Sequence, residues 1–238
     1  MNEYLGEFFG TMVLLFLGDG VVAGVLLNRT KAQNAGWLVI TTAWAFAVLF
    51  GILTARAIGG PGYINPVGPL VGLMTGGLPA DKAAGLAAAE VLGAFAGAVL
   101  TWLHYLPHWA ETPDPGLKLG VFCTAPAIRN PPANLVSEAL GTFVLVFVAA
   151  TITEKALGPY LGVPVVAALV WGIGLSLGAT TGYAINPARD FGPRLAHALL
   201  PIPGKGPSDW GYAWVPVVGP VLGGALGAVA VKYLIPPP

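Results

Sequence analysis

Charged residues are scarce in this chain, and neither sign prevails. Only 9% of the residues are Asp, Glu, Lys or Arg, and the formal net charge is +0. So few charged side chains cannot cover the surface of a water-soluble globule. In addition, 55% of the residues are hydrophobic and the mean hydropathy is +0.75. We therefore predict an integral membrane protein. The balanced charge argues against a nucleic acid partner.

Cysteine and histidine are also rare. A single cysteine, Cys123, excludes an internal disulfide framework and a metal site built from cysteines. Three scattered histidines and this one cysteine do not supply a catalytic cluster. We expect no metal, no cofactor and no enzymatic activity.

Long apolar stretches are plentiful by contrast. A helix that crosses the hydrocarbon core needs about 20 residues, and six stretches are long enough: 4–27, 36–57, 83–106, 133–152, 162–180 and 212–235. Two shorter segments, 66–76 and 187–199, are too short to span. The sequence thus predicts an all-α membrane protein with six transmembrane helices and two re-entrant half-helices.

Both short segments begin at an Asn-Pro pair that follows a glycine-rich stretch. The pairs belong to the triplets Asn65-Pro66-Val67 and Asn186-Pro187-Ala188. Asn is a favoured N-cap, and Pro at the first helical position loses no hydrogen bond. Irregular backbone at membrane depth is tolerated only where protein covers it or where it lines water. The glycine-rich approaches therefore predict a cavity.

The chain also repeats itself. Residues 7–11 (EFFGT) open the first span, and residues 138–142 (EALGT) open the fourth. Three spans in each half make the second half enter from the opposite side, as an inverted repeat. We predict one membrane channel domain over 1–238 with repeats at about 1–110 and 133–238. This symmetry brings the two Asn-Pro helix starts face to face near the bilayer midplane.

These features resemble the major intrinsic proteins, the family of aquaporins and glycerol facilitators, over nearly the whole chain. Asp190 followed by residues 191–194 (FGPR), together with Pro216 and Val217, is similar to the glycerol-facilitator branch. The resemblance implies a multi-pass channel in the plasma membrane with its amino terminus inside. It also implies a homotetramer with one pore in each subunit.

The resemblance further implies a selectivity filter made of Trp44, Gly174, Tyr183 and Arg189. Water-specific members typically carry His at the Gly174 position, so glycine is expected to leave room here. Two aromatic faces then hold the carbon chain of a polyol while the Arg189 guanidinium binds its hydroxyls.

Other residues are expected to line or support this pore. Backbone carbonyls form an acceptor ladder, and the Asn65 and Asn186 amides are central donors; the carbonyls belong to Gly62, Tyr63, Gly182 and Ala184. Three acidic residues support the re-entrant loops: Glu7, Glu138 and Asp190. Asp19 and Glu90 depart from the family pattern, and the sequence names no partner for either.

The resulting hypothesis is a passive channel that excludes ions and protons. Its expected solutes are glycerol and water, with dihydroxyacetone, urea, hydrogen peroxide and undissociated lactic acid as further candidates. One alternative is a predominantly water-selective channel. A second is a proton-coupled secondary transporter, in which Glu7, Glu90 and Glu138 would relay protons.

Overall fold

The computed structural model describes residues 2–152 and 154–235, and of residues 154–156 and 158–160 it describes the backbone alone. The predicted domain, 1–238, extends beyond this part at residue 1 and at 236–238. All ten regular elements of the described part are helices: α1 (Asn2–Leu26), α2 (Trp37–Ile58), α3 (Val67–Met74), α4 (Ala80–His104), α5 (Leu106–Glu111), α6 (Pro115–Phe122), α7 (Pro131–Ala149), α8 (Glu154–Ser176), α9 (Pro187–Leu199) and α10 (Val215–Leu234).

Five of these helices are long and apolar enough to cross a bilayer, namely α1, α2, α4, α7 and α10. Helix α8 adds the apolar segment Leu161–Ser176. The two short helices α3 and α9 lie where the sequence predicts half-helices. The predicted fold class is thus confirmed, although α3 begins at Val67, one residue later than expected.

The distribution of polar and apolar side chains is that of a protein in lipid. Large apolar residues point outward, and Leu92, Leu140 and Leu226 are each about 60% exposed. Carboxylates are buried instead: Glu7 and Glu90 are both 0% exposed. Lipid can cover the apolar surface, whereas a buried carboxylate needs partners inside the protein. The protein is therefore a multi-pass membrane protein.

Close helix crossings hold the helices of each half of the chain together. Helix α1 packs against α2 and α4, while α10 packs against α7. Gly93 of α4 lies on the Phe8 carbonyl of α1, and Gly223 of α10 lies on the Ala139 carbonyl of α7; a Cβ at either glycine would overlap that oxygen. Small residues permit such crossings where lipid offers no hydrophobic drive for association.

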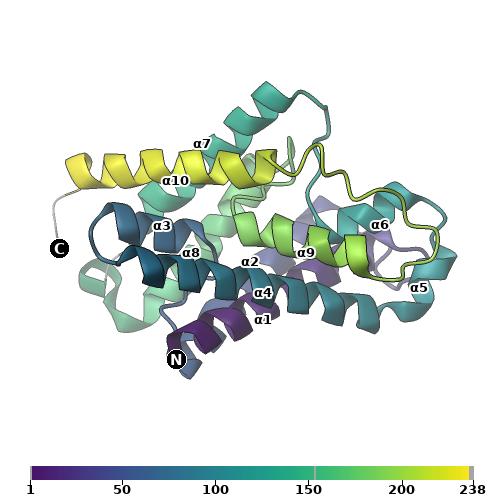
Figure 1. The fold of residues 1–238 in the computed structure, drawn as a ribbon, viewed down its shortest axis with the longest axis horizontal. Coiled ribbons are helices and arrows are strands. Elements are labelled where there is room, and N and C mark those ends of the chain that lie inside the picture. The colour runs from purple at the N-terminus through teal and green to yellow at the C-terminus, as the bar shows by residue number, and fades with distance from the viewer. Residues whose placement is uncertain (1, 153, 236–238) are drawn as a thin grey trace.

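Each half-helix is held by the opposite half of the chain. Helix α9 contacts α4, and α3 contacts α10. Figure 1 shows α1 beginning and α10 ending at the left of the molecule, with α5 and α6 at the right. The sequence predicted no helix between 106 and 133, yet α5 and α6 form there. The Asp114 side chain accepts the Gly116 N–H and so caps α6.

Candidate pore and selectivity filter

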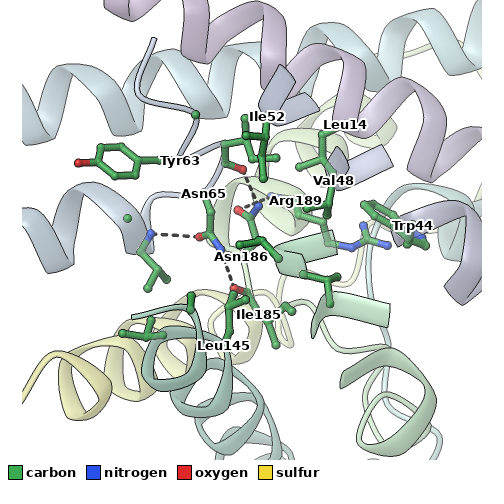
Figure 2. A pocket seen from close by; sticks show the side chains of 18 of the residues that line it. Leu14, Trp44, Val48, Ile52, Tyr63, Asn65, Leu145, Ile185, Asn186 and Arg189 are labelled. Carbon is green, nitrogen blue, oxygen red and sulfur yellow. Dashed lines mark hydrogen bonds between the residues drawn. The ribbon is translucent and has the colours of Figure 1, made fainter. Parts of the chain in front are cut away.

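The two re-entrant loops are tied together by their asparagines. Asn65 donates a side-chain N–H to the Ile185 carbonyl at 2.9 Å, and Asn186 donates to the Ile64 carbonyl at 2.8 Å. Figure 2 shows both bonds at the centre of the cavity. Each amide nitrogen has two hydrogens. One hydrogen joins the loops, so the second remains for a solute.

The same asparagines cap the helices that follow them. The Asn65 side-chain oxygen accepts the Val67 N–H, and the Asn186 oxygen accepts the N–H groups of Ala188 and Arg189. Pro187 occupies the first turn of α9, where its missing N–H costs nothing. Pro66 immediately precedes α3. The N-terminal ends of both half-helices therefore meet at the two asparagines.

Backbone strain marks the residue before each asparagine. Ile64 has a φ of 47° and Ile185 a φ of 42°, both in the left-handed region. This region is costly for a β-branched side chain. Each isoleucine immediately precedes the asparagine of its loop, and its carbonyl accepts the side-chain N–H of the asparagine in the other loop. The strain thus aims these carbonyls at the opposite loop.

Two buried glutamates hold this backbone in place. Glu7 accepts the N–H groups of residues 62–64 at 2.6, 3.1 and 2.6 Å. Glu138 accepts those of Ala184 and Ile185 at 3.0 and 2.9 Å. Because the carboxylates satisfy these N–H groups, the backbone carbonyl oxygens of the same loops are free to face the cavity.

A cavity of about 240 Å³ runs past both loops. Figure 2 shows Tyr63 toward one end, the asparagines in the middle, and Arg189 with Trp44 at the other. Loop residues supply a polar side that includes Gly62, Tyr63 and Ala184. The rest of the lining is mainly apolar and includes Leu14, Val48, Ile52, Val67, Leu145, Val166 and Val170.

Trp44 and Arg189 line the end of the cavity away from Tyr63 (Figure 2). The Arg189 guanidinium carbon lies 4.2 Å from the centroid of the Trp44 ring, within cation–π range. Arg189 also donates to the Phe122 carbonyl at 3.2 Å. Both side chains are largely buried, with 5% of Trp44 and 7% of Arg189 exposed. The expected filter pair is thus in direct contact.

Gly174 and Gly182 lie behind the cavity and are not among the residues that line it. A Cβ on Gly174 would lie 2.9 Å from the Tyr183 ring and 3.1 Å from Thr41. The room that glycine leaves is therefore taken by Tyr183, which does line the cavity. Gly182 packs against Thr124.

Asp190 joins α9 to the loop that follows α6. One carboxylate oxygen accepts both the backbone N–H and the hydroxyl of Thr124 at 2.8 Å. The other accepts the Arg194 side chain at 2.8 Å, and Arg194 continues to the carbonyls of Ser208 and Asp209. Sequence reasoning missed Thr124 and Arg194 as supports. The spacing of four between Asp190 and Arg194 on one helix was the available signal for the latter.

Asp19 and Glu90, the two residues that depart from the family pattern, are both buried. Asp19 lies on α1 at 0% exposure, with a carboxylate oxygen 3.7 Å from an Arg189 guanidinium nitrogen. Glu90 lies on α4, also at 0% exposure. Neither Glu90 nor the two loop-supporting glutamates line the cavity.

Comparison with known proteins agrees with this geometry. The sequence profile described as Major intrinsic protein matches residues 1–231. The probable glycerol uptake facilitator protein of Thermotoga maritima is 53% identical, over 98% of this chain and all of that protein. Glycerol uptake facilitator protein 3 of Lactiplantibacillus plantarum is 51% identical, over 98% of this chain and 96% of its own. The X-ray structure of the aquaglyceroporin from Plasmodium falciparum superposes with a TM-score of 0.85 at 25% identity, covering 98% of this chain and 96% of that one.

Proposed function

The chain belongs to the major intrinsic protein family, a family of channels and facilitators, and on that premise we propose that it is a passive channel for glycerol in the plasma membrane. Water and other small neutral solutes share the pathway. The relatives at 53% and 51% identity carry the name of glycerol uptake facilitator, which supports this solute. We also propose the inverted-repeat domain and a homotetramer with one pore in each subunit.

The mixed lining of the cavity, polar groups of the two loops together with apolar side chains, carries the proposal. A polyol presents a row of hydroxyls on one side and C–H groups on the other. The loop carbonyls and the Asn65 and Asn186 amides match the hydroxyls, while the apolar side chains match the C–H groups. At the filter the Arg189 guanidinium offers donors beside the Trp44 ring.

Ion exclusion follows from the two helix ends. A helix N-terminus carries about +0.5 of an elementary charge, and the N-termini of α3 and α9 meet at the asparagines. Cations and protons are repelled there. Anions lose hydration that so few donors cannot replace. Neutral solutes remain.

The transporter alternative receives less support. Glu7 and Glu138 are occupied by loop N–H groups, and neither they nor Glu90 line the cavity. A proton relay requires carboxylates along the solute path. Glu7 and Glu138 instead suit a static scaffold that holds the loops.

The test is solute flux into proteoliposomes measured by stopped-flow light scattering. We expect glycerol to equilibrate down its gradient faster than in protein-free liposomes, with no effect of an uncoupler. A panel of dihydroxyacetone, urea, hydrogen peroxide and lactic acid at low pH ranks the other solutes. Rapid water flux without glycerol flux would favour the water-selective alternative. Accumulation of glycerol against its gradient, abolished by the uncoupler, would contradict a passive channel.

A further inference from the structure

Asp19 is a buried carboxylate that the pore described above does not use. Its side chain lies on α1 at 0% exposure. Within residues 2–152 and 154–235, neither of its oxygens has a hydrogen-bond donor in range. One of them lies 3.7 Å from an Arg189 guanidinium nitrogen, which is ion-pair distance but longer than a hydrogen bond. A carboxylate buried in this way needs a compensating charge.

Helix α1 forms the back of the filter at this level. Gly18, the neighbour of Asp19, is where the Trp44 ring rests, since a Cβ on Gly18 would overlap that ring. The Trp44 ring in turn carries the Arg189 guanidinium on its face. Two consecutive residues of α1 therefore contact the filter. Gly18 provides the space for the Trp44 ring, and Asp19 faces the Arg189 guanidinium.

The other charges around Arg189 are already paired. Both Asp190 oxygens are bonded to Arg194, at 2.8 and 3.0 Å, and one of them also to Thr124. The Arg189 side chain forms a hydrogen bond only to the neutral Phe122 carbonyl in the described part of the chain. Asp19 is thus the carboxylate left to balance Arg189, and each of the two Asp–Arg pairs, Asp19 with Arg189 and Asp190 with Arg194, has a formal charge of zero.

We propose that Asp19 is the counter-ion and positioning residue of Arg189, and that it makes the filter electrically neutral. The inference rests on the proposed function, because it assumes that Arg189 lines the solute path. In this arrangement Arg189 supplies hydrogen-bond donors without a net positive charge. A neutral filter does not attract small anions that would compete with a polyol. The barrier to cations then belongs to the two half-helix ends.

Asp19→Asn tests this role, because it removes the charge while conserving shape. Glycerol flux is measured in nitrate and in gluconate, an anion too large for the filter, at equal ionic strength. We expect no difference in the parent. In Asp19→Asn we expect nitrate to slow glycerol by about threefold or more, because an unpaired buried cation attracts the anion strongly. Asp81→Asn, the same change at an exposed residue of α4, is the matched control and should behave as the parent.

A second variant covers failure to fold. If Asp19→Asn does not reach the membrane, adding Arg189→Gln removes the orphaned cation and should restore the yield of folded protein. Equal glycerol flux of folded Asp19→Asn in both anions would overturn the proposal. A double variant that is no better folded than Asp19→Asn would overturn it as well. A parent without glycerol flux contradicts the proposed function instead, and the yields of the two variants still test the ion pair.

Discussion

Single residues set the width of the proposed filter, and we expect Gly174 to do so indirectly, through Tyr183. Its missing side chain lets the Tyr183 ring withdraw against α8, where the two groups are in close contact. Any side chain at this position has to displace that ring or Thr41. The filter therefore depends on a residue that the solute does not touch.

We predict that Gly174→His reduces glycerol flux by more than about tenfold, because its ring drives Tyr183 toward Trp44 and Arg189. Osmotic water flux should fall much less, since water needs less width. Gly172→His is the matched control, because a Cβ there meets no atom within 4 Å. Stopped-flow light scattering on both variants, with equal protein content, gives the comparison. Unchanged glycerol flux in folded Gly174→His would remove Gly174 from the filter.

The central asparagines offer a second test at this scale. Asn186→Asp replaces the N–H that bonds the Ile64 carbonyl with an oxygen, so two acceptors face each other. Loss of such a buried bond costs about 1–3 kcal/mol. Asn186→Gln keeps the donor on a longer side chain. We expect lower thermal stability and lower glycerol flux for the aspartate variant, and equal values for the two would contradict a donor role.

Cys123 should be unreactive in the folded protein. Only 2% of it is exposed, and burial raises the pKa of its thiol. The thiolate is the reactive form, so a raised pKa leaves less of it at neutral pH. We expect maleimide labelling at pH 7 to be at least about tenfold slower than after unfolding in detergent, because both access and ionisation are reduced. Similar rates in the two states would show that Cys123 is open to solvent.

At the scale of helices, close packing at Gly93 joins α4 to α1, and close packing at Gly223 joins α10 to α7. The two glycines occupy equivalent places in the two halves, and each lies on the backbone carbonyl of the helix that carries a loop-supporting glutamate. A shift at either crossing moves that glutamate relative to its loop. Helix packing and pore geometry are therefore coupled.

We predict that Gly93→Ala and Gly223→Ala each lower stability by about 1–3 kcal/mol, the usual cost of overpacking. Gly162→Ala on α8 is the control, because a Cβ there meets nothing within 4 Å. Thermal unfolding in mild detergent, followed by loss of monodisperse protein, measures the difference. Equal midpoints for the three variants would mean that the helices separate at little cost.

At the scale of the whole molecule, the exposed apolar surface must be covered by lipid or by other copies of the chain. We expect a homotetramer, and chemical crosslinking in mild detergent should produce species of up to four chains and no more. A monomer that conducts glycerol would contradict the tetramer and leave the pore unaffected. A ladder that continues past four would contradict closed symmetry.

Much of this fold can be predicted from composition and pattern. Low charge and six apolar stretches determine a membrane protein, because each segment that crosses the lipid must itself be apolar and about 20 residues long. The two Asn-Pro pairs also determine where α3 and α9 begin to within one residue, because capping depends on neighbouring residues. Carboxylates at membrane depth beside the re-entrant loops predict loop-supporting roles for Glu7 and Glu138, and their bonds to the loop N–H groups agree with this prediction.

Only the tertiary structure decided which distant residues share a site. Asp19 and Arg189 lie on α1 and α9, and nothing in their local sequences states that these helices face each other at that height. The same holds for Thr124 with Asp190, and for Tyr183 in the space beside Gly174. Such contacts depend on the relative height and rotation of packed helices, which the packing of the whole bundle sets. The sequence by itself determined the pore's plan, and the packing decided its charge balance and width.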